Sequence, residues 1–225
     1  PSRKSDLLSY LARVTVTGAD ITFTDQVIGK SWHVLATDMQ ISRFIDRLKG
    51  EMSLVLNSDQ RQTAIEVWAE YRTQSKRLEL DVKFDEVSPV LFADMPSVLA
   101  PLKSFHIPFS GRISLGMPID GKVDRFGVNL SGGAGKIYLP KPFEWPIDVE
   151  AIELKASYDG HLKNGQIEKL EVQVAPGRTL ALPAPISHKL PLRAFNLKGA
   201  FENDGANWEL REFDADLNGP KIKAS

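Results

Sequence analysis

Residues 87–116 read VSPVLFADMPSVLAPLKSFHIPFSGRISLG, and they separate two long stretches of alternating sequence. Within 88–104, apolar residues recur at helical spacing, and prolines stand where they suit a first helical turn. Ser88 and Asp94 are placed to cap two short helices. Ile107–Gly111 then interrupts the helical spacing, and strand-like alternation resumes. The stretch therefore predicts a short two-helix insertion near residues 88–104 of a β protein.

On both sides of this insertion, apolar and polar residues alternate with the period of a β-strand. Residues 78–84 (LELDVKF) and 152–158 (IELKASY) are clear examples, because each gives a strand one apolar and one wet face. Short polar turns join about fourteen such runs, so neighbours along the chain are expected to pair antiparallel. The fold class predicted is mainly β: a long, strongly curved antiparallel meander sheet, either a gutter or groove or an open barrel-like sheet.

Three local features refine this prediction. Gly18–Asp20 is expected to turn the chain between two short strands of a hairpin. Near Glu212 the apolar residues change from even-numbered to odd-numbered positions, which predicts a β-bulge. Ser131–Lys136 (SGGAGK) resembles a phosphate loop, but the glycine five residues before Gly135 is absent and Ile137 replaces the required hydroxyl residue. A glycine-rich turn or bulge is the better interpretation.

The whole chain is expected to form one elongated domain cut from a longer protein, because it starts on PSRKSD and stops on KIKAS without a terminating signal. Its parts are a linker or helix remnant at 1–10 and a single β-groove domain at 11–225, divided into a first strand series (11–86), the helical interlude (87–105) and a second strand series (106–225).

Composition excludes several classes of function. With 28 basic and 29 acidic residues the net charge is −1, which argues against a nucleic-acid surface that works by bulk charge. The absence of cysteine excludes disulfides, cysteine-ligated metals and thiol nucleophiles. No stretch approaches the ~20 apolar residues that span a bilayer.

The residues that could carry chemistry are dispersed. The four histidines lack paired metal-ligand spacing, and Ser110 lacks the context of a nucleophile elbow. We therefore expect no enzyme, no catalytic residue, no cofactor and no metal. A deep polar pocket with His106 or His161 beside a carboxylate would be needed to support a hydrolase instead.

The apolar faces raise a packing question, because every strand has one and a single helical patch cannot cover them all. A barrel or sandwich would pack sheet on sheet around a dry core. A curled gutter would leave an apolar trough that needs an outside partner. The residues alone leave both possibilities open.

Several segments resemble the central region of AsmA-like proteins, closest to the YhdP-type branch. ARVTVTGADITFTDQVIGKSW (12–32) is similar to the family's strand, acidic turn and strand followed by aspartate and tryptophan. FADMPSVLAPLKSFHIPFSGRISL (92–115) resembles the family's interlude, whose helical turns lead into an apolar-Pro-apolar-Ser-Gly strand start. YDGHLKNGQIEKLEVQVAPGRTLAL (158–182) and LKGAFENDGANWELREFDADLNGPKIKAS (197–225) are similar to its repeating strand pairs. Together with the intervening strands, the likeness extends over nearly the whole chain.

This resemblance implies a bacterial periplasmic protein whose parent is anchored in the inner membrane. It implies a bridge that conducts phospholipids between the inner and outer membranes, with acyl chains lying along an apolar β-groove. The expected partners are phospholipid acyl chains and, through the parent, both membranes, with no nucleic acid. The alternative is a structural or protein-interaction β module of the cell envelope with a dry packed core.

The expected lipid-binding residues are the apolar positions that face the groove. The interlude around Leu91, Val98 and Leu102 is expected either to gate the groove or to cap one end of the sheet. The groove lining comprises Val14, Val16, Ile21, Phe23, Leu54, Leu56, Ile65, Val67, Leu78, Leu80, Val82, Ile113, Leu115, Val128, Leu130, Ile152, Leu154, Leu170, Val172, Phe195, Leu197 and Leu210.

Overall fold

The computed structural model describes residues 12–25, 30–58, 61–92, 97–139, 146–176, 179–181, 189–191, 194–203, 208–216 and 221–224. The first strands are β1 (Arg13–Asp25), β2 (Lys30–Arg43), β3 (Arg47–Ser58), β4 (Arg61–Arg72), β5 (Arg77–Val87), β6 (Phe105–His106) and β7 (Phe109–Pro118). They are followed by β8 (Arg125–Gly132), β9 (Gly135–Ile137), β10 (Ile147–Asp159), β11 (Asn164–Val174), β12 (Thr179–Ala181), β13 (Lys189–Pro191), β14 (Ala194–Asn203), β15 (Trp208–Asp216) and β16 (Lys221–Ala224).

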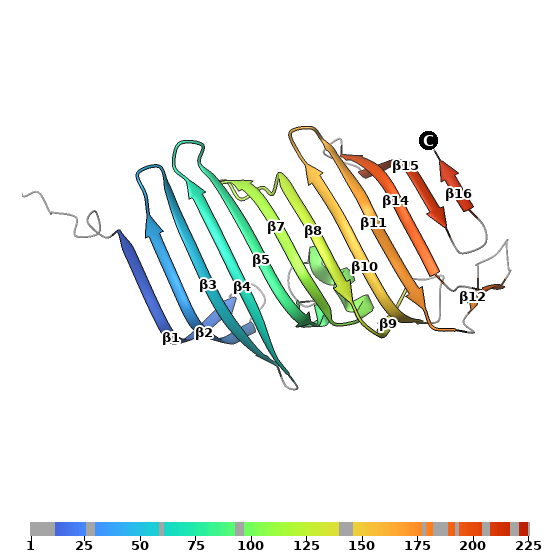
Figure 1. Ribbon diagram of the computed structural model, residues 1–225, viewed down its shortest axis with the longest axis horizontal. Coiled ribbons are helices and arrows are strands. Elements are labelled where there is room, and N and C mark those ends of the chain that lie inside the picture. Colours follow the sequence, from blue (N-terminus) through green and yellow to red (C-terminus); the bar gives the residue numbers. More distant parts are fainter. Residues whose placement is uncertain are drawn as a thin grey trace, which may run out of the picture. The chain divides into compact units, whose positions relative to one another are not determined.

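Most of these strands belong to one 14-stranded sheet, and β12 and β13 form a separate two-stranded sheet (Figure 1). The main path runs β1-β2-β3-β4-β5-β7-β8-β10-β11-β14-β15-β16; off this path, β9 pairs with β10, and β6 pairs with β9. Pairs such as β1–β2, β3–β4 and β10–β11 are antiparallel. Short turns between alternating runs favour this order, because each strand folds back on the one before it. The predicted mainly-β antiparallel meander is therefore confirmed.

The predicted pair of α-helices near residues 88–104 is wrong. The described residues contain no α-helix there, but two 3-10 segments, η2 (Pro89–Phe92) and η3 (Ser97–Ser104). Leu91 N donates to Ser88 O at 3.1 Å, which is the short hydrogen bond of such a turn. Pro101 lies inside η3 and has no N–H, so it cannot continue an α-helical ladder. Residues 93–96, with the proposed cap Asp94, lie outside the described part of the chain.

The predicted hairpin at Gly18 is also wrong, whereas the bulge predicted near Glu212 is confirmed. β1 continues through Gly18, whose φ is +64°, and pairs with β2 along its full length. Gly18 therefore bends one strand instead of ending it. In β15, the register against β14 shifts between Glu212 and Leu210, so Arg211 is the extra residue.

The contacts divide the chain into two compact units. Unit 1 comprises the described residues of Pro1–Lys83 and Ser114–Val123, and unit 2 those of Phe84–Ile113 and Asp124–Ser225. Strands β1–β4 lie in unit 1, and β8–β11 and β14–β16 lie in unit 2. Each unit is described separately below.

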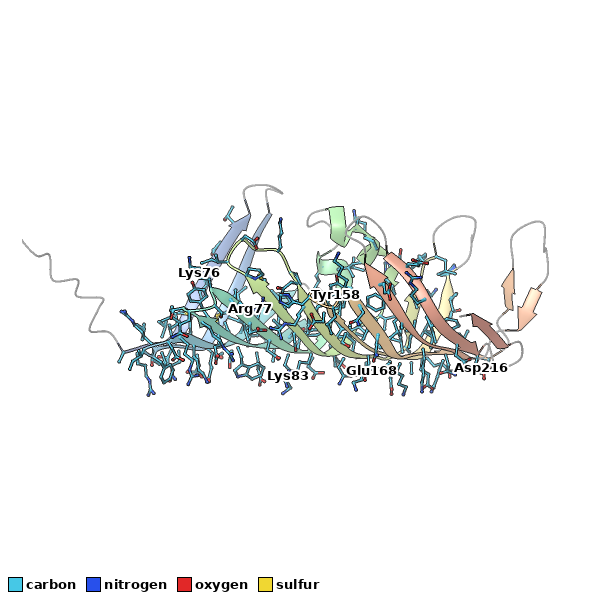
Figure 2. The ribbon with its side chains drawn as sticks, turned by 90° about the horizontal axis from the view of Figure 1, so that it is seen from above. Lys76, Arg77, Lys83, Tyr158, Glu168 and Asp216 are labelled. Carbon is cyan, nitrogen blue, oxygen red and sulfur yellow. The ribbon has the colours of Figure 1, made fainter. Side chains whose placement is uncertain are left out.

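Unit 2 has a packed core at one end of its strands. Ile107, which is fully buried, packs with Phe109, Ile137, Val149 and Ile152. This core is held by β6, which pairs with β9, and by a hydrogen bond from Tyr138 N to Ser104 O at 2.8 Å. The segment that includes η2, η3 and β6 therefore acts as a fixed cover over part of the sheet, on the same side as Tyr158 (Figure 2).

Two glycines make room for this cover. A Cβ on Gly132 would come within 2.8 Å of Ile107 Cγ2, and one on Gly135 within 2.7 Å of Ile107 Cγ1. The glycine-rich run 131–136 thus ends β8 and begins β9, as expected of a turn. It also provides the surface against which Ile107 packs. Only residues without a side chain permit this close approach.

We predict that Ile107→Ala lowers the unfolding free energy of unit 2 by about 3 kcal/mol, because it leaves a cavity in the core. Leu162→Ala is the matched control, since Leu162 is 69% exposed. It should change stability by less than about 0.5 kcal/mol. Urea unfolding monitored by circular dichroism measures both. Equal stability of the two variants would show that residues 105–109 do not form a core.

Candidate functional site

Unit 1 carries rows of apolar residues across its strands. In an antiparallel sheet, directly opposed residues share a face. The register sets Val16 opposite Met39, Met39 opposite Met52, and Met52 opposite Val67. A second row runs Ile21–Val34–Leu56 and a third contains Leu54 and Ile65.

A pair of matched irregularities keeps these rows on one face. The register of β2 against β3 shifts between Ala36 and Asp38, so Thr37 is an extra residue. The β1–β2 register stays constant, so the alternation of side chains between the two faces must be interrupted in β1 at the same place as in β2. Gly18 lies opposite Thr37 in this register. Val16 and Ile21, five positions apart, consequently face the same side.

Most of the described hydrophobic side chains on this face of unit 1 are only half-buried. Among the hydrophobic side chains described in unit 1, only Val34, at 7% exposure, is buried. Val14 and Ile41 on the same face remain 41% and 43% exposed. A face whose hydrophobic side chains stay partly exposed is a candidate binding surface for another apolar group.

Unit 2 repeats the arrangement across β8, β10, β11 and β14. Leu130, Leu154, Leu170 and Leu197 form one row, with each residue directly opposite the next. The neighbouring rows are Gly132–Ile152–Val172–Phe195 and Val128–Ala156–Ile167–Gly199. The leucine row is only half-buried, whereas Ile152 in the next row lies under the core cover.

The register brings most of the predicted lining residues together, within each unit, on one face. Asp81 accepts a hydrogen bond from Ser114 at 2.9 Å, so these two lie on the polar face and Leu80 and Leu115 on the other. The side chains of Phe23 and Leu210 lie outside the described part of the chain, although their strand positions fit these rows. On the apolar faces by register lie Val14, Val16, Ile21, Leu54, Leu56, Ile65, Val67, Val128, Leu130, Ile152, Leu154, Leu170, Val172, Phe195 and Leu197; the remaining predicted residues, Leu78, Val82 and Ile113, are half-buried in β5 and β7.

Sequence reasoning missed several members of these faces. Val34, Met39 and Ile41 in β2 belong to the face of unit 1, but the extra residue Thr37 interrupts their alternation. Ile167 was missed for the same reason, because the register of β11 shifts between Ile167 and Leu170. A search that allows one inserted residue per strand would have found them.

Three aromatic rings continue the apolar face of unit 2 beyond the leucine row. Phe126 stacks on Tyr158 with ring centroids 5.5 Å apart, and Tyr158 stacks on Phe201 at 6.1 Å. Gly165 lies between Tyr158 and Phe201 in the register, and a Cβ there would come within 2.5 Å of Phe201 Cε2. The missing side chain therefore lets the Phe201 ring lie over β11 and reach Tyr158.

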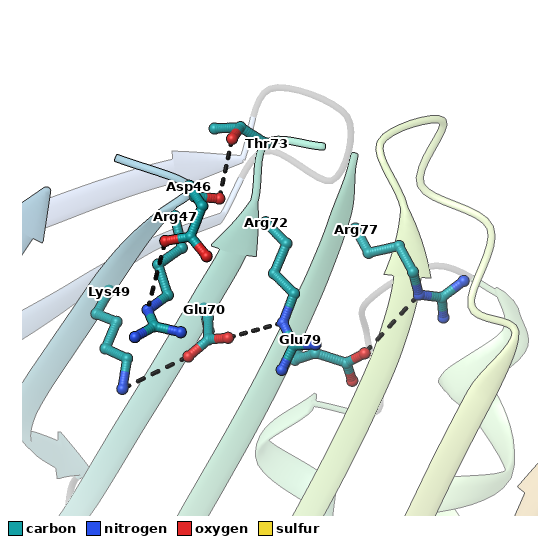
Figure 3. Close-up of polar contacts among 8 residues, drawn as sticks. All are labelled: Asp46, Arg47, Lys49, Glu70, Arg72, Thr73, Arg77 and Glu79. Atoms are coloured by element: carbon teal, nitrogen blue, oxygen red, sulfur yellow. Dashed lines mark hydrogen bonds and ion pairs between the residues drawn. The ribbon is translucent and has the colours of Figure 1, made fainter. Parts of the chain in front are cut away.

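The opposite faces are polar and carry ion pairs. In unit 1, Glu70 lies between Arg72, at 2.8 Å, and Lys49, at 3.5 Å (Figure 3). The hydrogen bond from Arg72, helped by nearby positive charge, holds the pKa of Glu70 below its ordinary value. In unit 2, Lys155 pairs with Glu168, which lies on the opposite side of the sheet from Tyr158 (Figure 2).

The polar face of unit 1 also contains a hollow of ≈ 230 Å³, bounded by residues that include Glu51, Trp68 and Ser114. Trp68 is 36% exposed there. Of the carboxylates that line it, Glu70 pairs with Arg72 and Lys49, and Glu79 pairs with Arg77.

The residues considered for catalysis do not converge in the described structure. His161 Nε2 lies 3.6 Å from Asp124 Oδ2, but its side chain is 67% exposed in a turn. His106 packs edge-on against Tyr138 with centroids 4.8 Å apart. Ser110 Oγ donates to Asp85 and accepts from Glu86 N, which ties β7 to β5. The side chains of His33 and His188 lie outside the described residues.

We predict that Gly165→Ala breaks the stack of Tyr158 on Phe201 and lowers the stability of unit 2 by about 1–3 kcal/mol through overpacking. Gly133→Ala is the matched control, because a Cβ there meets nothing within 4 Å. Near-ultraviolet circular dichroism reports the aromatic stack, and urea unfolding the stability. An unchanged aromatic signal in Gly165→Ala would contradict the role given to this glycine.

We predict that Arg72→Met raises the pKa of Glu70 towards its ordinary value, because the variant loses the hydrogen bond that lowers it. Carbon-13 NMR titration of the carboxyl measures this. Lys83→Met, which removes a cation paired with Glu66, should leave Glu70 unaffected. Since the pKa of Glu70 is depressed in the folded chain, its stabilising contribution exists above the unfolded pKa and is lost as the pH falls through the folded value. The stability difference between Arg72→Met and the wild type should therefore shrink in acid.

Across the described ranges, no group of three or more His, Asp or Glu side chains is placed to hold a metal ion. No helix in the same residues is long and apolar enough to cross a membrane. Comparison of the chain with protein-family models, curated proteins and solved structures found no match.

Proposed function

We propose that the apolar faces of this sheet bind the acyl chains of lipids. The observation that carries the proposal is the apolar face of unit 1, where most of the described aliphatic side chains are only half-buried, Val14 and Ile41 are exposed, and only Val34 is buried. The half-buried leucine row of unit 2 supports it. Covering such surface removes apolar area from water, which is worth about 0.8 kcal/mol per buried CH₂.

The chemistry of the faces favours acyl chains over a polar ligand. The rows consist of Val, Ile, Leu and Met with occasional Gly, Ala, Thr or aromatic residues, and none of the described residues in them is charged. Such a surface offers dispersion contacts without directional hydrogen bonds. Because similar side chains recur from strand to strand, a bound chain would meet similar contacts at successive positions, which suits movement along the sheet.

In this proposal the chain is a segment of a bridge that conducts phospholipids between the inner and outer membranes of a bacterial envelope. The resemblance of its segments to AsmA-like proteins supports a periplasmic location and a parent anchored in the inner membrane. No catalytic step is required, because lipids would move by exchanging one apolar contact for another. The polar faces would remain towards water.

A structural or protein-interaction module is the second candidate, and the core of unit 2 favours it. There the segment with Ile107 and Phe109 covers the apolar face with the chain's own residues. If a protein partner covered the remaining face in the same way, the apolar rows would be part of a dry interface instead of a lipid path.

We predict that a photo-crosslinking amino acid forms phospholipid adducts at Leu80 and Leu154 but not at their neighbours Asp81 and Lys155. Each pair samples opposite faces of one strand, so exposure to the same vesicles is matched within the pair. The purified chain is irradiated with phosphatidylethanolamine–phosphatidylglycerol vesicles, and adducts are identified by mass spectrometry. The same positions in the parent protein, irradiated in cells, test whether lipid is bound there in vivo.

Equal labelling within each pair would show non-specific insertion and contradict an apolar lipid path. Absence of lipid at all four positions, with each variant folded by circular dichroism, would favour the structural module.

A further inference from the structure

Three turns of unit 1, those that follow β2, β4 and β7, lie together at one edge of the sheet (Figure 1). Thr73 donates to Asp46 O from its N–H and from its hydroxyl, each at 2.9 Å, which joins the second turn to the first (Figure 3). Ile119 N donates to Lys76 O at 3.0 Å and joins the third turn to the second. The three turns therefore form one continuous surface. We call it the turn edge, and it comprises residues 43–47, 72–77 and 118–123.

The turn edge carries the most exposed of the large hydrophobic side chains described in unit 1. Ile45 is 105% exposed and Ile119 is 69% exposed. Phe44 and Val123 are each 47% exposed. On the faces of the same unit, no described side chain of this kind exceeds the 43% of Ile41. Single hydrophobic residues are common on protein surfaces, but four on one joined surface indicate a contact with another apolar group.

The first turn holds its apolar residues outside the core of the unit. Phe44 N donates to Arg47 O at 2.8 Å, which closes the turn. The Arg47 guanidinium lies over the Phe44 ring, 5.3 Å from its centroid, so the ring contacts a cation. Ile45 lies between these two residues in the chain, at the tip of a turn that is fixed by its own contacts.

Positive charge surrounds these apolar side chains. The turn edge contains six basic and two acidic residues. Two further carboxylates, Glu70 and Glu79, pair with arginines of this set, which leaves a net charge of +2. Lys76 and Lys122 are exposed and have no ion-pair partner in the described part of the chain. Because the whole chain has a net charge of −1, this positive charge is a local feature of the turn edge.

We propose that the turn edge docks on an anionic lipid bilayer. Lys76 and Lys122 would lie among the negatively charged headgroups, and Ile45 and Ile119 would reach the boundary between headgroups and acyl chains. Proteins that lie on membranes combine apolar side chains with lysine or arginine in this way. The attraction of cations to an anionic leaflet acts only within about a Debye length, which suits charges at the tips of turns.

The apolar side chains favour a bilayer over other anionic partners. A nucleic acid would pair with the cations through its phosphates and would leave isoleucine and valine in water. A bilayer offers negative charge at its surface and apolar chains directly beneath it, so it matches both properties of the turn edge. This docking goes beyond the proposed lipid path, which uses the faces of the sheet, and does not depend on it.

The first test is flotation of the whole chain with vesicles. The wild type should bind vesicles of phosphatidylcholine and phosphatidylglycerol more tightly than vesicles of phosphatidylcholine alone. Lys76→Gln/Lys122→Gln should lower the affinity for the anionic vesicles about 25-fold, since each cation near an anionic surface contributes about five-fold. Lys83→Gln is the matched control, because Lys83 is an exposed lysine of unit 1 outside the turn edge. It should bind as the wild type does.

A second variant separates bilayer docking from simple attraction between charges. Ile45→Ser/Ile119→Ser keeps every charge and should weaken binding to the anionic vesicles at least about ten-fold, because it removes apolar side chains from the acyl boundary. Unchanged binding by this variant, when the lysine variant has lost it, would mean a purely electrostatic surface and would overturn the proposal. Wild-type binding that does not depend on phosphatidylglycerol would overturn it as well.

A fluorescent label tests which part of the chain meets the bilayer. The chain has no cysteine, so Ile45→Cys and Lys83→Cys each introduce a single thiol for an environment-sensitive fluorophore. On anionic vesicles the label at position 45 should shift to the blue and the label at position 83 should not. Equal shifts at both positions, or none at position 45, would overturn docking through the turn edge. The lipid path has a separate readout, adduct formation at Leu80, so either proposal can fail without the other.

Discussion

The organisation of this protein depends on antiparallel register, because directly opposed residues must share a face of the sheet. A single extra residue in one strand would turn every following side chain to the other face. In unit 1 the extra residue Thr37 in β2 is matched by the bend at Gly18 in β1, so the apolar rows continue across both strands. In unit 2 the shift in β11 between Ile167 and Leu170 appears against both of its neighbours. With these irregularities, the apolar residues of each unit stay on one face of the sheet.

The two units differ in how far their apolar face is covered by the described residues. In unit 2, the segment that carries Ile107 and Phe109 covers one end of the face, and Gly132 and Gly135 allow it to approach closely. In unit 1, the described residues supply no such cover, and Val34 is the only buried hydrophobic side chain among them. The core of unit 2 supplies rigid packing, while the face of unit 1 leaves surface for an apolar partner.

The polar faces of the sheet carry many weak ion pairs. Exposed pairs such as Glu70 with Arg72 and Lys49, or Lys155 with Glu168, contribute little individually because solvent screens them. They nevertheless lie consistently on the face opposite the apolar rows.

The sequence by itself determined the β class, the antiparallel order and most of the apolar face, because period-two alternation and short polar turns depend on local physics. Residues such as Leu54, Ile65, Leu154 and Leu170 could be placed on a face without any knowledge of their partners. Tertiary structure decided the rest. Proline and packing made the interlude a pair of 3-10 segments over a core. Gly18 forms a bend within one long strand. Gly165 leaves space for the Phe201 ring to lie over β11. These outcomes depend on contacts between residues far apart in the chain, and alternation along one strand carries no information about them.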